Sequence, residues 1–219
     1  MVFIMLKLFN VNFNNMPERK LDEVFSLRKI TFKDRLDWKV TCIDGKESDQ
    51  YDDENTNYIL GTIDDTIVCS VRFVEMKYPT MITGPFSPYF ADIDLPIDGF
   101  IESSRFFVEK ALARDMVGNN SSLSTILFLA MVNYAKDRGY KGILTVVSRG
   151  MFVLLKRSGW NITVVSQGES EKNEIIYLLH LGVDVDSQQK LINKIRRIHQ
   201  IEPASILENW PLIVPNIIK

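Results

Sequence analysis

The chain contains 219 residues, enough for one domain with a full hydrophobic core. Hydrophobic residues make up 46% of it and charged residues 25%, which is the balance of an ordinary globular protein. The formal net charge of −2 gives no reason to expect the basic surface of a nucleic-acid-binding protein. With two histidines and two cysteines, the sequence also argues against a zinc site or a cysteine–histidine nucleophile.

The N-terminal stretch MVFIMLKLF is apolar but too short to span a membrane, and it lacks a signal-peptide cleavage pattern. Cys42 and Cys69 fit a reducing compartment without a disulfide framework. We therefore expect a cytoplasmic protein with no membrane span, no bound metal and no nucleic-acid partner. We expect it to be a monomer.

The N-terminal half predicts helices followed by a β-hairpin. Apolar residues recur near helical spacing in residues 16–38, which predicts one or two helices ending near Trp38. The acidic run DGKESDQYDDE, residues 44–54, is typical of a solvated loop. Residues 57–63 and 66–76 then alternate with period two around a pair of aspartates, which predicts a compact hairpin.

The middle of the chain combines a long loop with an unusual strand. Residues 78–99 contain four prolines and predict an irregular connection of the length that often serves function. The stretch GFIESSRFFVEK, residues 99–110, follows as a buried strand that nevertheless contains Glu102 and Arg105. In a flat strand these two side chains point to opposite faces, whereas a bulge near Ser103 would re-aim one of them.

From residue 119 onward, helical and strand patterns alternate. Serine capping candidates and closing glycines mark the helices, and β-branched runs mark the strands. The expected elements are helices at 119–139, 151–159 and 187–200, strands at 142–148, 161–167 and 174–181, and an extended segment at 210–215. We therefore expect one α/β domain over residues 1–219, with a central mixed, twisted sheet and helices on both faces.

Charged residues on apolar elements allow two interpretations. Arg28 lies on the first helix and Arg72 on an apolar strand, and the acidic run offers Asp49 and Asp52 as partners. Such charges form either a structural network of buried ion pairs, which is expensive to desolvate, or a functional cleft. The residue pattern alone leaves both open.

Seven short stretches together carry a resemblance to a known family: LRKITFKDRLDW, SDQYD, SVRF, ESSRFFV, ILFLAMVNYA, TVVSR and RSGW. In this order and spacing they resemble the acyl-homoserine-lactone synthases, the LuxI-type autoinducer synthases of bacterial quorum sensing. The resemblance covers a catalytic core of about residues 5–181 and leaves a variable C-terminal helix and tail, residues 182–219. The hallmark positions of that family are filled here by Arg28, Phe32, Trp38, Asp49, Asp52, Arg72, Glu102 and Arg105.

The resemblance implies a GNAT-like acyltransferase fold with a splayed central strand. It also implies a reaction in which S-adenosylmethionine is a substrate, and no bound cofactor is expected. An acyl-acyl carrier protein would supply the acyl chain as a thioester on phosphopantetheine. The amine of S-adenosylmethionine would take this chain, and lactone closure would then release methylthioadenosine.

The same resemblance implies roles for individual residues. Glu102 is expected to act as general base, with Arg105 and Ser104 as further catalytic residues. Backbone amides near Phe106 and Phe107 are expected to stabilise the oxyanion. S-adenosylmethionine binding and the charge network are assigned to Arg28, Phe32, Trp38, Asp49, Asp52 and Arg72.

Acyl-chain and carrier-protein contacts are also implied. Thr145 is expected to favour a 3-oxo chain, 3-oxo-hexanoyl or 3-oxo-octanoyl. The wall of the acyl site is assigned to Thr145, Phe86, Phe106, Phe128, Met131, Val147, Ser148, Met151 and Leu155. Arg149, Lys156 and Arg157 are expected to dock the acidic carrier protein.

The sequence leaves two alternative functions open. The first is a GNAT-type N-acyltransferase that uses acyl-coenzyme A on another amine. The stretch RDMVGNNSSLS, residues 114–124, stands where such enzymes carry a glycine-rich pyrophosphate loop, which argues against coenzyme A as donor. The second is a non-catalytic sensor domain that binds S-adenosylmethionine or acyl chains.

Overall fold

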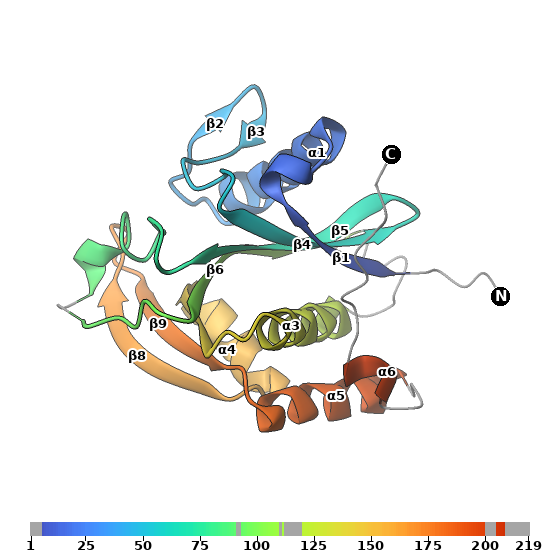
Figure 1. Cartoon of the computed structure of the whole chain (residues 1–219). Helices are drawn as coiled ribbons and strands as arrows, with labels where there is room; N and C mark the ends of the chain where they lie inside the picture. Colours follow the sequence, from blue (N-terminus) through green and yellow to red (C-terminus); the bar gives the residue numbers. More distant parts are fainter. Residues whose placement is uncertain (1–5, 91–92, 110, 112–119, 200–204, 209–219) are drawn as a thin grey trace.

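A seven-stranded sheet organises the chain, with helices on both faces (Figure 1). The structure is a computed structural model that describes residues 6–90, 93–109, 111, 120–199 and 205–208. The strand order is β1-β4-β5-β6-β7-β9-β8, and every neighbouring pair is antiparallel except β6 and β7. The strands are β1 (Lys7–Asn12), β4 (Thr56–Ile63), β5 (Thr66–Glu75), β6 (Phe100–Val108), β7 (Gly142–Ser148), β8 (Ile162–Glu169) and β9 (Ile175–Gly182).

The predicted hairpin is confirmed as β4 and β5. Asp64 and Asp65, between the strands, have φ angles of 48° and 65°. Two consecutive residues with positive φ form the tight turn whose twist matches that of the flanking strands. Aspartate tolerates this conformation better than most residues, which explains why the pair marks the turn in the sequence.

One face of the sheet is covered by the first helical segment. Helix α1 (Glu18–Arg28) continues as a π-helical stretch η2 (Lys29–Arg35), so the prediction of helix ending near Trp38 is confirmed. Asp37, with a φ of 51°, ends the segment. This face buries Val24 and Phe32 against apolar side chains of β4 and β5. A short hairpin of β2 (Cys42–Ile43) and β3 (Lys46–Glu47) follows.

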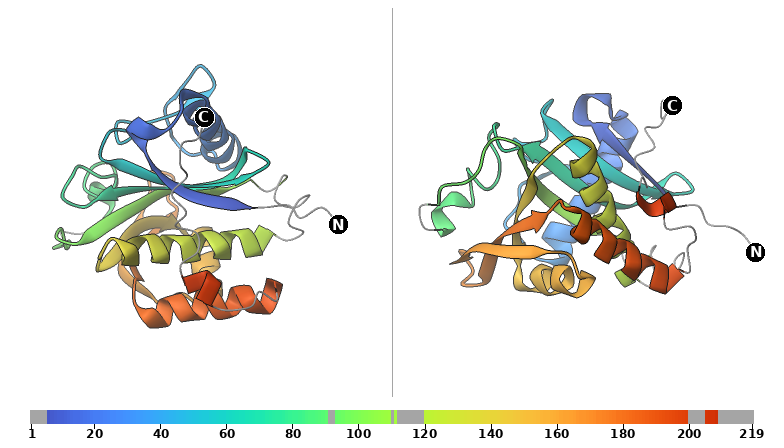
Figure 2. Two further views of the ribbon diagram at one scale, coloured as in Figure 1. Left: turned by 45° about the vertical axis from the view of Figure 1, so that its right-hand side comes forward. Right: turned by 60° about the horizontal axis from the view of Figure 1, so that its bottom comes forward.

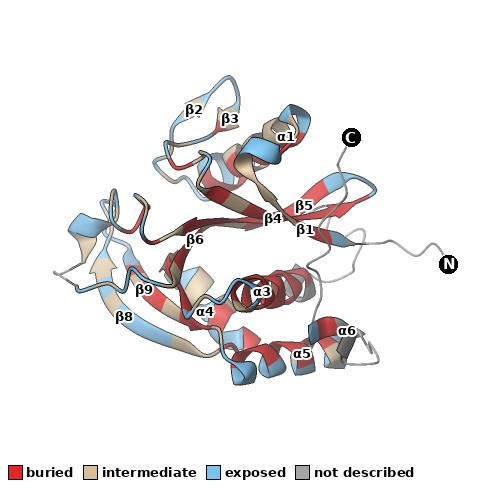
Figure 3. Cartoon of the chain, viewed as in Figure 1, coloured by how far each residue is buried: buried red, intermediate tan, exposed pale blue. Residues whose placement is uncertain are grey.

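The other face carries the largest core. Helix α3 (Asn120–Asp137) lies between the sheet and α5 (Val185–His199), as the left view of Figure 2 shows. The described part of α3 is buried along most of its length (Figure 3), as expected for a helix that is apolar all round. Helix α4 (Arg149–Ser158) and the short α6 (Ser205–Glu208) complete this layer.

Strand β6 contains the bulge, but two residues later than expected. Ser104 pairs with Arg72 of β5, while Phe107 pairs with Ser70, so β6 carries one extra residue between these pairs. Arg105 has a φ of 52°, a left-handed conformation that costs a non-glycine residue about 1–3 kcal/mol. Of the two alternatives, the bulged strand is the one found: Arg105 and Arg72 both pair with Asp49, and Arg72 also donates to the Ser104 hydroxyl, so the bulge brings Arg105 toward their side of the sheet.

Strands β6 and β7 separate soon after they meet. Their parallel ladder pairs Phe100–Glu102 with Gly142–Leu144 only, although both strands run several residues further. The splayed central strand of the expected GNAT-like fold is thereby confirmed. No helix in the part of the chain that the structure describes is both long and apolar enough to cross a membrane. Residues 112–119, which hold part of the RDMVGNNSSLS stretch, and the segment 210–215 lie outside the described residues.

Candidate active site

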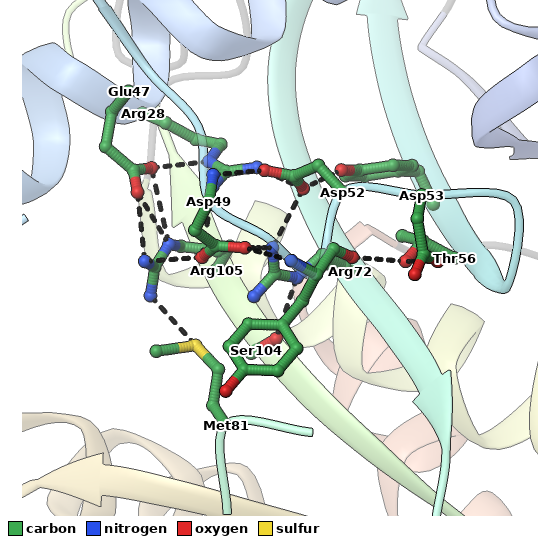
Figure 4. Close-up of polar contacts among 12 residues, drawn as sticks. Arg28, Glu47, Asp49, Asp52, Asp53, Thr56, Arg72, Met81, Ser104 and Arg105 are labelled. Atoms are coloured by element: carbon green, nitrogen blue, oxygen red, sulfur yellow. Dashed lines mark hydrogen bonds and ion pairs between the residues drawn. The ribbon is translucent and has the colours of Figure 1, made fainter. Parts of the chain in front are cut away.

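Glu47 bridges two arginines in a buried cluster of charges (Figure 4). Its side chain is fully buried and accepts hydrogen bonds from Arg28 Nε at 2.6 Å and from Arg105 Nη2 at 2.9 Å. Arg28 comes from the last turn of α1 and Arg105 from the bulge of β6. Because the carboxylate bridges both guanidinium groups, it ties the helix to the sheet and holds Arg105 in its strained conformation.

Asp52 forms the second bridge of the cluster. One of its oxygens, Oδ1, accepts from Arg28 Nη1 and from Arg72 Nη1, both at 2.8 Å, and from the hydroxyl of Tyr58. Burial alone would raise the pKa of Asp52, but Arg28 and Arg72 together lower it well below its usual range. Burial likewise raises the pKa of Tyr58, and the Asp52 charge adds to this effect. The phenol is therefore a permanent donor at neutral pH.

Asp49 is the most exposed carboxylate of the cluster, with 18% of its side chain accessible. It accepts from Arg72 Nη1 at 2.5 Å and from Arg105 Nη2 at 2.8 Å. Its backbone N–H donates to Asp52 Oδ2 at 2.8 Å, so the loop that supplies both acids is fixed by its own hydrogen bonds. Asp49 is thus the anionic group of the cluster nearest to solvent.

The cluster is electrically balanced. Three guanidinium groups face three carboxylates, which makes burial of all six tolerable although each ion alone would be expensive to desolvate. Burial, aided by the nearby Arg28, lowers the pKa of Arg105 despite the opposing effect of Glu47. The Coulomb attraction of Asp52 raises the pKa of Arg28 and Arg72 although burial opposes it.

The expectation of a solvated acidic loop is wrong for part of residues 44–54. Asp49 and Asp52 were identified as possible partners of the arginines, but Glu47 was missed. The only indication of Glu47 in the sequence is its position two residues before Asp49 in the acidic run. Its partners, Arg28 and Arg105, lie 19 and 58 residues away, so no local pattern points to them. Burial of these acids follows from the three arginines, each of which comes from a different element.

Glu102 lies apart from these ion pairs. It is 1% exposed, and its Oε2 accepts from the backbone N–H of Ile82 at 2.7 Å. Its other oxygen, Oε1, is buried without a hydrogen-bond partner among the described residues. Burial raises the pKa of Glu102, and the Ile82 N–H and the Arg72 charge offset this only in part. Among the described residues Glu102 forms no ion pair, so the interpretation that it joins a buried ion pair is not supported.

A cavity of about 690 Å³ opens where β6 and β7 diverge. Its walls combine the splayed ends of both strands with α4, the end of η2 and the loop before β6. Of the residues predicted for the site, those that line it are Phe32, Trp38, Phe86, Ser104, Arg105, Phe106, Met131, Thr145, Val147, Ser148, Met151, Leu155 and Arg157. Thr31, Arg35, Leu36, Met81 and Ser103 line it as well and were missed by the sequence analysis.

Other predicted residues lie behind or beside the wall of the cavity. Phe128 is fully buried and stacks on Phe106, with ring centroids 5.1 Å apart, so it supports the wall without lining it. Arg28, Asp49, Asp52, Arg72 and Glu102 are likewise absent from the lining. Arg149 and Lys156 are exposed on α4 and do not reach the cavity.

Aromatic rings connect the ion cluster with the cavity. Phe32 and Trp38 stack with centroids 5.1 Å apart, and the guanidinium of Arg105 lies 5.5 Å from the Phe32 ring. Because Phe32, Trp38 and Arg105 all line the cavity, one end of it presents aromatic faces and a cation held by carboxylates. The α4 side of the lining, which includes Met151 and Leu155, is largely apolar.

Thr145 closes the apex of the splay. Its hydroxyl donates to the backbone carbonyl of Ser103 at 2.9 Å, one position beyond the last pair of the β6–β7 ladder. Ser103 also lines the cavity with Thr145. Two hydroxyl groups therefore mark the wall where the strands part.

Comparison with known proteins identifies the family. Residues 12–191 match the sequence model described as autoinducer synthase. The chain is 88% identical over 215 residues to an acyl-homoserine-lactone synthase of Yersinia enterocolitica, covering 98% of this chain and all of that one.

Solved structures confirm the fold. BjaI, described as a CoA-dependent acyl-homoserine lactone synthase with SAM and isopentyl-CoA, superimposes with a TM-score of 0.77 at 22% identity, covering 87% of this chain and 90% of that one. A putative N-acetyltransferase from Lactobacillus plantarum gives a TM-score of 0.56 at 12% identity, covering 82% and 99% of the two chains. The chain belongs to the autoinducer synthase family, the acyltransferases that make acyl-homoserine lactones.

Proposed function

We propose that the chain transfers an acyl group from acyl-acyl carrier protein to the amine of S-adenosylmethionine and then closes the lactone. The observation that carries this proposal is the junction of a balanced ion cluster with a cavity that is aromatic at one end and apolar at the other. A doubly cationic substrate with its own carboxylate fits the first end, and an acyl chain fits the second.

S-adenosylmethionine would bind where Arg105, Phe32 and Trp38 meet. Arg105 lines the cavity and would hold the substrate carboxylate, while the aromatic faces would contact the sulfonium. Asp49 does not line the cavity, but it is the most exposed acid of the cluster and pairs with Arg105, which makes it the candidate partner for the ammonium. Arg28, Arg72, Glu47 and Asp52 would act behind this surface by holding Asp49 and Arg105 in place.

The amine must lose a proton before it attacks the thioester. Glu102 has the raised pKa and the unpaired oxygen of a base, but it does not line the cavity. Ser104 does line it, lies two residues from Glu102 on β6 and accepts from Arg72 Nε at 3.1 Å. We therefore assign Ser104 as the link through which the proton reaches Glu102, directly or with a water.

Amide formation and lactone closure then follow in order. The amine nitrogen bonds to the thioester carbon, and the phosphopantetheine thiol leaves with a proton. Backbone amides of β6 near Phe106 and Phe107, beyond the last β7 pair, would stabilise the oxyanion. The substrate carboxylate next attacks the carbon beside the sulfonium, and methylthioadenosine leaves as a neutral thioether. This second step cancels two charges, which a water-poor cavity favours.

We also propose a 3-oxo-hexanoyl or 3-oxo-octanoyl chain as the transferred group. The hydroxyl of Thr145 is committed to the Ser103 carbonyl at 2.9 Å, so a 3-oxo group must compete for that proton or accept from the Ser103 hydroxyl. Either hydroxyl would donate a hydrogen bond to the 3-oxo group, whereas an unsubstituted chain has no acceptor at that position. Selectivity from one such hydrogen bond amounts to about 0.5–1.5 kcal/mol.

Carrier protein and coenzyme A are distinguished by experiment. The purified protein is given S-adenosylmethionine with 3-oxohexanoyl-acyl carrier protein or with 3-oxohexanoyl-coenzyme A, and lactone is quantified by mass spectrometry. We expect at least tenfold higher kcat/KM with the carrier protein. Equal or higher efficiency with coenzyme A would refute the donor assignment. Lactone from neither donor would refute the proposed reaction.

A further inference from the structure

We propose that the tip of the β8–β9 hairpin is a charge latch that holds the Trp38 wall of the cavity closed. Lys172 Nζ lies 2.6 Å from Asp37 Oδ2, and Lys39 Nζ lies 2.9 Å from Glu171 Oε2. Lys172 also donates to the backbone carbonyl of Asp37. The pairs join segments 132 and 135 residues apart in sequence. The connection is therefore purely tertiary.

The segment that the latch holds is part of the cavity itself. Leu36 and Trp38, on either side of Asp37, line the cavity, and Trp38 stacks on Phe32. Asp37 has a positive φ and its N–H donates to the Lys33 carbonyl at 3.1 Å, while the N–H of Trp38 donates to Phe32 O at 2.7 Å. This helix ending aims the Asp37 side chain outward and the Trp38 side chain inward. A displacement of Asp37 would therefore also displace Trp38.

The hairpin also rests on a second cavity-forming segment. A Cβ added to Gly168 of β8 would lie 2.0 Å from the backbone oxygen of Tyr89, so only glycine permits this close approach. Burial raises the pKa of Tyr89, and a hydrogen bond with Glu171 raises it further. Phe86, whose ring lies 6.5 Å from that of Tyr89, lines the cavity. One hairpin tip therefore contacts both segments at this end of the cavity.

The arrangement of charges sets the register of the contact. Each side presents one acid and one base, and only the observed pairing places unlike charges together. A shift that brought Lys39 to Lys172 and Asp37 to Glu171 would be repulsive at both points. All four side chains are at least 46% exposed, so each pair is weak and the contact opens readily. A wall that must admit substrate and then exclude water needs this property.

The kinetic test uses the Lys39–Glu171 pair, because Asp37 has a left-handed backbone that a substitution would strain. Lys39→Glu places like charges together, and we expect it to raise the KM for S-adenosylmethionine about fivefold, equivalent to about 1 kcal/mol. We expect kcat to change less than twofold, about 0.4 kcal/mol. The charge-swapped variant Lys39→Glu with Glu171→Lys should restore KM to within about twofold of wild type.

The matched control is Lys190→Glu. It breaks a similarly exposed ion pair with Asp186, 2.6 Å long, on α5 away from the cavity, and KM should remain unchanged. A wild-type KM in Lys39→Glu would overturn the latch. A raised KM that the charge swap fails to restore would also overturn it, since Lys39 would then act in another way.

A second measurement needs no substrate, so it separates failure of the latch from failure of the proposed reaction. The protein has three tryptophans, and 5-fluorotryptophan labelling gives each a ¹⁹F resonance, with that of Trp38 assigned from Trp38→Phe. We expect Lys39→Glu, but not Lys190→Glu, to increase the solvent isotope shift of the Trp38 resonance, and the charge swap to reverse it. A Trp38 resonance that is the same in all variants would contradict the latch.

Discussion

Glu47 accepts hydrogen bonds from Arg105 with both carboxylate oxygens: Oε1 lies 2.9 Å from Nη2, and Oε2 lies 3.3 Å from Nε. The two residues are 58 positions apart, and one of them sits in a left-handed bulge. A bidentate pair fixes the orientation of the guanidinium as well as its position. Glu47 therefore helps to place Arg105 in the cavity wall, although Glu47 itself does not line the cavity.

Glu47→Gln keeps the shape of this side chain and removes its charge. Arg28 and Arg105 then lose the carboxylate that bridges them, and the buried cluster carries a net positive charge. We expect the free energy of unfolding, measured by urea titration, to fall by about 3–5 kcal/mol. Glu54→Gln, in the same acidic run but exposed, should change it by less than about 0.5 kcal/mol. Equal effects of the two substitutions would show that Glu47 makes no special contribution.

Glu102→Gln tests the base. The amide cannot take the proton, so we expect kcat to fall by about 10²- to 10⁴-fold while S-adenosylmethionine still binds by calorimetry. A variant that turns over at the wild-type rate would eliminate Glu102 from proton transfer.

The same substitution has a predicted effect on stability that depends on pH. Burial raises the pKa of Glu102 in the folded state, so the native protein favours the protonated form. Stability from this group is present below the unfolded pKa of about 4.3 and is lost as pH rises through the folded pKa. The free energy of unfolding of Glu102→Gln, relative to that of wild type, should therefore be higher at pH 8 than at pH 4. An identical difference at both values would contradict the raised pKa.

Thr145→Val removes the donor at the apex of the splay and leaves the Ser103 carbonyl without its partner. We expect the ratio of 3-oxo to unsubstituted product, in competition between the two donors, to fall about threefold to tenfold. Ser103→Ala, tested alongside, reports whether the second hydroxyl contributes. A product ratio unchanged in both variants would refute selection by these hydroxyls.

Carrier-protein docking is tested on α4. Lys156 and Arg157 are exposed on α4, and Arg157 lines the cavity while Lys156 does not. We expect Lys156→Glu with Arg157→Glu to raise the KM for acyl-acyl carrier protein at low salt, and the difference from wild type to shrink as salt screens the charges. A KM difference that persists unchanged at high salt would point to a local structural effect.

The sequence predicted what local patterns encode. The Asp64-Asp65 turn, the apolar α3 and the alternating strands of the hairpin were all found, because propensity and periodicity act over a few residues. The bulge was placed near Ser103 instead of Arg105, since nothing local requires an arginine to adopt positive φ. Glu47 and the contacts of Lys172 were missed for a related reason. Their partners are distant in sequence, and only the folded sheet brings them together.

The stoichiometry of products tests the central claim most directly. The protein is incubated with S-adenosylmethionine and acyl-acyl carrier protein, and lactone and methylthioadenosine are quantified together by mass spectrometry. Acylation followed by lactone closure predicts the two products in a one-to-one ratio at every time point. Acyl transfer without methylthioadenosine, or conversion of S-adenosylmethionine to S-adenosylhomocysteine, would contradict it.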